Sequence, residues 1–236
     1  MGKAIVIGGS AGMGKELALL LARDGNQVAV TGRSNERLKQ VQSVNPAHIV
    51  CFPLDLPDPV TEAKLDRLVM ELGGLDLLIL SAGRGEINPQ LSYDTDKTII
   101  DLNVSAYTRV INWGFSYFKE QGHGHIVGLT SVAGIRGIRH APAYAASKSY
   151  QIRYLESLRQ KAAKEKLKIT VTEARPGFVD TKEAEVRRFW ASSPEKASKQ
   201  IYRAIRSKRN MVYITRRWAL VGFILSIIPR FIHHRL

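Results

Sequence analysis

Short runs of apolar residues, rich in Val and Ile, alternate along this chain with longer amphipathic stretches. This alternation constrains the fold more than any other feature. The runs occupy residues 3–8, 27–33, 48–55, 75–83, 124–131, 167–177 and 211–215. Most of these runs have consecutive apolar residues at their centre and no regular alternation with polar residues, which is typical of strands covered on both faces. Repeated β-α units of this kind predict a doubly wound α/β fold.

The stretches between these runs have the periodicity of helices. Helices are expected at residues 14–25, 34–44, 58–72, 97–118, 141–165 and 193–208, with Ser34 as an N-cap and the last helix beginning near Ser193. No linker separates a second domain. We therefore predict one Rossmann-type domain over residues 1–215, with a seven-stranded parallel sheet in the order 3-2-1-4-5-6-7, followed by a tail at 216–236. Ligands of such sheets bind at the carboxyl edge, where the strand order reverses.

The net charge of +14 is concentrated at the C-terminal end. Residues 182–236 contain 13 Lys/Arg and 3 Asp/Glu, a balance of +10, whereas residues 1–181 carry 22 − 18 = +4. A basic segment implies an anionic partner, either a membrane surface or nucleic acid, or else a solvated face. No helix-turn-helix or aromatic β platform is present, which argues against nucleic acid. The single cysteine, Cys51, excludes an intrachain disulfide, and we expect a cytoplasmic protein.

A glycine-rich turn follows the first predicted strand and opens the first predicted helix. Gly8, Gly12 and Gly14 surround Ser10 and Met13 in the sequence GGSAGMGKEL. Glycines there allow a pyrophosphate to approach the backbone, and the helix N-terminus offers N–H donors and a positive dipole end. Glycines also form ordinary turns, but this position favours dinucleotide binding.

The ends of the next strands indicate which dinucleotide is bound. Arg33 follows the second strand without an acidic neighbour, and its guanidinium suits a ribose 2′-phosphate. NADP(H) is therefore favoured over NAD(H), the alternative being that Arg33 is an ordinary surface arginine. Further cofactor contacts are expected where the third and fourth strands end, at Asp55, Leu56, Ala82 and Gly83.

Four polar residues are expected to meet at the same edge. Tyr144 and Lys148 lie one helical turn apart and so share a helix face. Ser131 ends the fifth strand, and Asn103 lies in the helix after the fourth. Together with the glycine turn, Asp55, SAG at 81–83, YAASK at 144–148 and RPGFVDT at 175–181, this arrangement resembles the short-chain dehydrogenase/reductase family up to about residue 215. Ile7 and Ser81 depart from the family pattern, which often has Thr and Asn there.

The resemblance implies an NADP(H)-dependent oxidoreductase that interconverts a carbonyl and a secondary alcohol. In it, Tyr144 would be the general acid/base, and Lys148 would favour the phenolate of a residue whose free pKa is near 10. Lys148 would also bind the nicotinamide ribose, Ser131 the substrate oxygen, and Asn103 a water that links Lys148 to solvent. The resemblance adds cofactor contacts at Pro176, Gly177, Val179 and Thr181. The resemblance also implies a homodimer or homotetramer. The alternative to an enzyme is a non-catalytic NADP-binding sensor or regulatory protein.

The tail contains an apolar run of eleven residues, 218–228. A bilayer crossing needs about 20 residues, so this run is too short to span. Arginines flank it at 216, 217, 230 and 235. This pattern predicts either a helix lying in a membrane surface, which favours an apolar or lipid-associated substrate, or a segment packed on its own domain or a partner subunit. His233 and His234 lack supporting acids or cysteines, so no metal site is predicted.

Overall fold

The computed structural model describes residues 2–180 and 190–233. Its seven strands form one parallel sheet in the order β3-β2-β1-β4-β5-β6-β7, which confirms the predicted order. The strands are β1 Lys3–Ile7, β2 Gln27–Gly32, β3 Ile49–Pro53, β4 Leu77–Leu80, β5 His123–Leu129, β6 Lys168–Pro176 and β7 Met211–Ile214.

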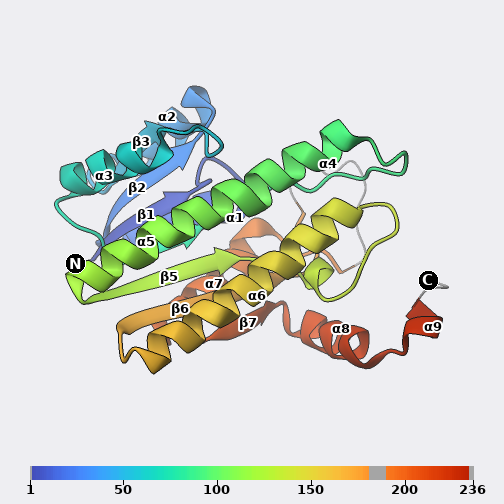
Figure 1. The fold of residues 1–236 in the computed structure, drawn as a ribbon. Helices are drawn as coiled ribbons and strands as arrows, with labels where there is room; N and C mark the ends of the chain where they lie inside the picture. Colours follow the sequence, from blue (N-terminus) through green and yellow to red (C-terminus); the bar gives the residue numbers. More distant parts are fainter. Residues whose placement is uncertain (1, 181–189, 234–236) are drawn as a thin grey trace.

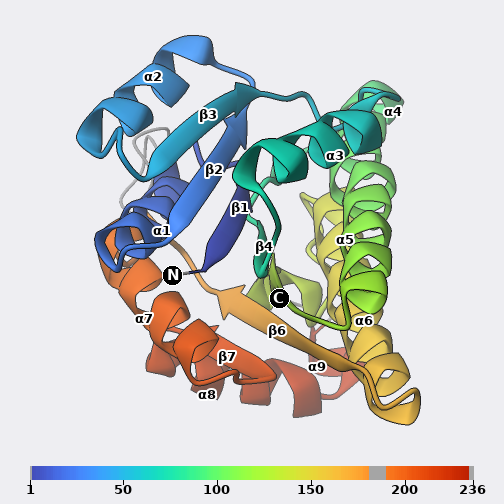
Figure 2. The same ribbon diagram turned by 90° about the vertical axis from the view of Figure 1, so that its left-hand side faces the viewer.

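Helices cover both faces of this sheet (Figures 1 and 2). One face is covered by α3, α5 and α6, and the other by α1, α2 and α7. The helices are α1 Gly12–Arg23, α2 Asn35–Val44, α3 Thr61–Leu72, α4 Tyr93–Ile100, α5 Tyr107–Gln121, α6 Pro142–Lys164, α7 Pro194–Arg206, α8 Arg216–Ile227 and α9 Arg230–His233. A π-helical turn, η1 Asp101–Ala106, joins α4 to α5, and a 3₁₀ turn, η2 Val132–Gly134, follows β5.

Both faces of the sheet are buried in hydrophobic clusters, which explains why the strands are continuously apolar. Successive residues of a strand point to opposite faces. Ile5 and Ile7 of β1 therefore pack beneath α3, α5 and α6, whereas Ala4 and Val6 pack beneath α1, α2 and α7.

The helical stretch after β4 is longer than the prediction of 97–118. It runs from α4 through η1 to the end of α5, covering residues 93–121. Asp94 and Asp96 lie in its first turn, where acidic side chains favour a helix N-terminus. This turn is polar, so the apolar periodicity did not indicate it. The predicted cap is confirmed, since the Ser34 hydroxyl accepts from the Arg37 N–H at 3.3 Å.

The tail forms α8 and α9, which extend past the carboxyl edge of the sheet (Figure 1). Trp218 and Gly222 are the buried residues of α8. Its other large apolar side chains are mostly exposed, as are those of α9. Within the described ranges, every helix is too short or too polar to cross a membrane.

Candidate active site

The glycine turn between β1 and α1 packs directly against the loop that follows β4. Gly8 has φ +76°, and a Cβ there would lie 2.6 Å from the Ala82 nitrogen. A Cβ on Gly14 would lie 2.3 Å from the Gly8 carbonyl oxygen. Only glycine permits both approaches. The structure therefore brings together two segments that the sequence assigns to the cofactor.

The N-terminus of α1 is left open by its own sequence. Its N-cap, Ala11, makes no side-chain cap, and no acidic residue lies in the first turn. Because the first N–H groups of a helix have no intrahelical partner, this end fits an anionic pyrophosphate. The Met13 carbonyl, by contrast, accepts from Ser198 Oγ at 3.0 Å, which ties the turn to α7.

The remaining predicted cofactor residues line the same edge. Arg33 is exposed directly after β2, and Ser10 lies beside Gly32, where a Cβ would fall 2.6 Å from Ser10 Oγ. After β3, Asp55 is exposed and Leu56 is buried. After β6, Val179 forms a β-bridge with Ser192. Thr181 lies outside the described residues.

Lys148 and Tyr144 lie near the start of α6, which opens with Pro142 at a position where proline favours helix initiation. Lys148 is 5% exposed, and its Nζ lies 6.0 Å from the centroid of the Tyr144 ring. The ammonium donates to the Leu129 carbonyl at 3.2 Å and to Gln151 Oε1 at 2.9 Å. Burial lowers the pKa of Lys148 to about 8, so the group is still mostly charged at neutral pH.

Asn103 is buried in η1 and joins three segments of the chain. Its side-chain amide donates to the Arg84 carbonyl at 2.7 Å and to Ser147 Oγ at 3.0 Å, and its Oδ1 accepts from the Arg84 N–H at 2.9 Å. Its backbone carbonyl accepts from Gln151 Nε2 at 2.8 Å. Asn103 and Lys148 are therefore linked through the amide of Gln151.

The loop after β4 packs against Lys148 and Tyr144, and Ser131 follows β5, whose Leu129 carbonyl accepts from Lys148. Ser131 Oγ accepts from the Ala133 N–H at 3.1 Å as the N-cap of η2, so its own proton remains available to another acceptor. A Cβ on Gly83 would lie 3.3 Å from Lys148 Nζ, and one on Gly85 would lie 3.0 Å from the Tyr144 ring. The loop thus packs closely against the tyrosine and the lysine.

Comparison with known proteins agrees with this geometry. Residues 2–191 match the family model described as short chain dehydrogenase. The chain belongs to the short-chain dehydrogenase family. It is 36% identical over 185 residues to an uncharacterized oxidoreductase of Myxococcus xanthus, covering 75% of this chain and 71% of that one. It is 29% identical over 182 residues to one of Staphylococcus epidermidis, covering 75% and 78%.

The fold is also that of a solved structure. A short-chain dehydrogenase from Streptomyces avermitilis superposes with a TM-score of 0.83 at 19% identity, covering 95% of this chain and 91% of that chain. The protein is thus a short-chain dehydrogenase-type oxidoreductase, as the sequence motifs indicated. Enzymes of this family use NAD(P)(H), act on small molecules and often form oligomers.

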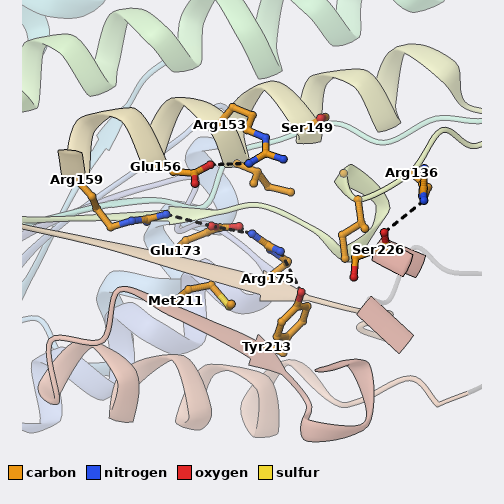
Figure 3. A pocket seen from close by; sticks show the side chains of 13 residues that line it. Arg136, Ser149, Arg153, Glu156, Arg159, Glu173, Arg175, Met211, Tyr213 and Ser226 are labelled. Atoms are coloured by element: carbon orange, nitrogen blue, oxygen red, sulfur yellow. Dashed lines mark hydrogen bonds and ion pairs between the residues drawn. The ribbon is translucent and has the colours of Figure 1, made fainter. Parts of the chain in front are cut away.

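A cavity of about 510 Å³ lies beside α6, and arginines and glutamates are among the residues that line it (Figure 3). Glu173, which is fully buried, accepts from Arg175 at 2.7 and 3.0 Å and forms an ion pair with Arg159 at 3.7 Å. Arg175 also donates to the Tyr213 hydroxyl at 3.0 Å. None of the four predicted catalytic residues lines this cavity. Its ion pairs therefore connect α6 to β6, and the Arg175–Tyr213 hydrogen bond adds β7, outside the candidate active site.

Two contacts of the candidate site were not anticipated from the sequence. Gln151 is a polar residue on the inward face of α6, three positions after Lys148, and that placement could have indicated it. The tail contact had no comparable signal. A Cβ on Gly177 would lie 2.1 Å from the Trp218 ring, and the Phe178 ring packs edge-on against Trp218 at 5.2 Å. In the described residues, no group of three His, Cys, Asp or Glu side chains could hold a metal.

Proposed function

We propose that this protein is an NADP(H)-dependent oxidoreductase that interconverts a carbonyl and a secondary alcohol, with Tyr144 as general acid/base. The observation that supports this most is the buried Lys148 ammonium beside the Tyr144 ring. A fixed positive charge favours the phenolate over the phenol. In a site shielded from water that electrostatic effect is stronger than in solution.

In this proposal each polar residue has a defined task. The Tyr144 hydroxyl donates a proton to the carbonyl oxygen during reduction and takes it back during oxidation. The Ser131 hydroxyl, whose oxygen is held by the Ala133 N–H, donates to the same substrate oxygen and orients it. Lys148 stabilises the deprotonated tyrosine. A nicotinamide cofactor bound at this edge of the sheet would supply or accept the hydride.

The preference for NADP(H) rests on Arg33. Arg33 is exposed and follows Gly32, the last residue of β2, which lies beside Ser10 of the glycine turn. Acidic residues that would instead accept from a 2′-hydroxyl do not flank it in the sequence. A charge-assisted contact of this kind is about twice as strong as a neutral one.

For the tail, we propose contact with an anionic membrane surface and an apolar or lipid-associated substrate. We treat residues 1–215 as the catalytic domain and 216–236 as the surface-binding tail of a cytoplasmic protein. Leu220, Phe223 and Ile227 of α8 are 61%, 61% and 62% exposed. The last 41 residues, 196–236, contain ten Lys/Arg and no Asp/Glu. Exposed apolar side chains among cations favour lipid over an acidic protein.

A homodimer or homotetramer is also part of this proposal. The helices α5 and α6 carry two stacked aromatic pairs, Trp113 with Tyr117 and Tyr150 with Tyr154, all only partly buried. Partly exposed aromatic groups of this kind are enriched in protein interfaces.

The decisive experiment is an NADPH-oxidation screen of the full chain against sugars, steroids, acyl ketones and lipid-linked ketones. We expect turnover with at least one apolar ketone, and faster turnover with NADPH than with NADH. NADPH binding without turnover across the whole panel would instead support a non-catalytic sensor.

A further inference from the structure

Gln151 is a completely buried side-chain amide that touches both Lys148 and η1. Its Oε1 accepts from Lys148 Nζ at 2.9 Å, and its Nε2 donates to the Asn103 carbonyl at 2.8 Å. The orientation of the amide is fixed by chemistry, because only the NH₂ end can donate to a carbonyl. Both ends of one side chain thus bridge a buried cation and a backbone acceptor.

The backbone acceptor belongs to an irregular part of the helix. Asn103 lies in η1, the π-helical turn between α4 and α5, and such turns interrupt the regular i→i−4 hydrogen bonding. Its side chain is fixed by Arg84 and by Ser147, whose hydroxyl donates in turn to the Tyr144 carbonyl at 2.8 Å. The anchor that Gln151 binds is therefore immobilised by several hydrogen bonds.

Among the described residues, Gln151 provides the side-chain acceptor of the Lys148 ammonium. Lys148 Nζ has three donors, and two of them go to the Leu129 carbonyl of β5 and to Gln151 of α6. The Gly83 loop and the Tyr144 ring lie on its remaining sides. Burial is what shifts the pKa of this lysine, with no ion pair to offset the shift among the described residues. A buried ammonium without a carboxylate depends strongly on each neutral acceptor.

The family resemblance implies a water, held by Asn103, that links Lys148 to solvent. The Gln151 amide is a separate link, which joins the lysine to the Asn103 carbonyl through protein atoms. We propose that Gln151 is a positioning residue of the oxidoreductase site, whose amide holds the Lys148 ammonium beside Tyr144 and ties it to the Asn103 carbonyl. This inference rests on the function proposed above.

Two variants of the full chain test it, with opposite expected effects. Gln151→Met keeps the length of the side chain but removes the acceptor, so Lys148 should lose its proton more readily. Gln151→Glu places a carboxylate beside the ammonium, so Lys148 should hold its proton more tightly. Gln160→Met, an exposed site on the same helix, is the matched control.

The first readout is NMR titration of protein labelled at the lysine side chains, with the Lys148 signal assigned from its absence in Lys148→Met. We expect the midpoint to move down in Gln151→Met and up in Gln151→Glu, each by about half a pH unit or more. The second readout is the pH profile of kcat/KM for ketone reduction. Its alkaline limb should shift in the same two directions, by about half a pH unit or more, so that the loss of turnover in Gln151→Met grows as the pH rises above neutral.

The outcomes separate this inference from the proposed function. Turnover by the wild type with unchanged midpoints in both variants would overturn the role of Gln151 and leave the function standing. Shifted midpoints in a protein without turnover would support the contact by which Gln151 holds Lys148 and refute the proposed carbonyl reduction. If Gln151→Met does not fold, as judged by circular dichroism, the near-isosteric Gln151→Glu carries the test alone.

Discussion

The indole ring of Trp218, in the tail, lies directly on the backbone of Gly177, in the segment after β6 that the sequence assigns to the cofactor. A Cβ at position 177 would fall 2.1 Å from the ring. The tail is therefore packed against the candidate active site through Trp218, while other side chains of the same helix face away from the body. Deleting the whole tail would disturb both features together, so single positions are needed to separate them.

Gly177→Ala should destabilise the protein because the new methyl group overlaps the Trp218 ring. Overpacking of this kind costs about 1–3 kcal/mol. Gly177 does not have a positive φ, so the expected cost comes from the clash with the ring and not from backbone strain. Trp218→Ala alone should also destabilise, because it empties a buried site. In the double variant the cost of Gly177→Ala should nearly vanish. Denaturant unfolding of the four proteins measures the coupling, and additive effects would contradict the contact.

Arg33→Ala should weaken NADPH binding and leave NADH binding almost unchanged. Losing a charge-assisted contact to phosphate costs about 1.5–3 kcal/mol, which corresponds to about tenfold or more in Kd. Cofactor fluorescence titration gives both constants. Arg67→Ala, at an exposed arginine of α3, is the control. Equal losses for the two cofactors would remove the basis for the NADP(H) preference.

Tyr144→Phe should retain NADPH binding and lose about 10²-fold or more in turnover, which is the scale of acid–base catalysis. The ring and its packing against Gly85 are kept, and only the hydroxyl is removed. Tyr150→Phe, on the same helix as Tyr144, removes only a hydroxyl contact with Thr108 of α5 and should remain active. Comparable activity in the two variants would require a different proton donor.

Replacing Leu220, Phe223 and Ile227 with serine should abolish cosedimentation with vesicles containing phosphatidylglycerol. These side chains supply the apolar contact, whereas Arg216 and Arg217 each add about 1 kcal/mol of attraction to anionic lipid. Arg216→Gln/Arg217→Gln should therefore weaken binding and reduce its salt dependence. The control exchanges Met70 and Ile87, which are exposed elsewhere, for serine. A wild type that ignores these vesicles at low salt would rule out the membrane proposal.

Acidification should destabilise the protein through His125. Burial lowers the pKa of His125 to about 4 from 6.5, and its Nε2 lies 2.8 Å from the Thr172 hydroxyl. Between about pH 4 and pH 6.5, His125 is therefore protonated in the unfolded chain but neutral in the folded protein. The stability present above pH 6.5 is lost as the pH falls, by about 2 kcal/mol at pH 5 from this group alone. His125→Gln should flatten that part of the pH dependence in urea unfolding, and an unchanged pH dependence in this variant would contradict the assignment.

The sheet and its helices could be predicted because their signals are local. Continuous apolar runs specify strands buried on both faces, and Ser34 caps α2 as its sequence position indicated. The first turn of α4 was missed because Asp94 and Asp96 stabilise it by charge and leave no apolar period. Nor does the sequence contain a signal for the π-helical geometry of η1.

In the candidate site, too, features with a local sequence signal could be predicted, whereas long-range contacts could not. Residues fixed by motif and by the end of a strand, such as Gly8 and Ser131, fall where the topology requires. The link from Lys148 through Gln151 to Asn103 depends on which way a side chain turns inside the core. The Trp218 contact depends on the path of a chain segment 41 residues after Gly177. Such long-range packing cannot be read from spacing or composition.

The central place of β1 in the sheet has a consequence for how the chain is made. β1 lies between β2 and β4, and β4 begins only at Leu77. While the ribosome is still synthesising residues before β4, one backbone edge of β1 has no partner, and α5 and α6, which complete the cover of one face, have not yet been made. An unpaired apolar strand edge is a template for aggregation. A nascent chain stalled before Leu77 should therefore depend on chaperones, and a fragment ending there should not fold by itself.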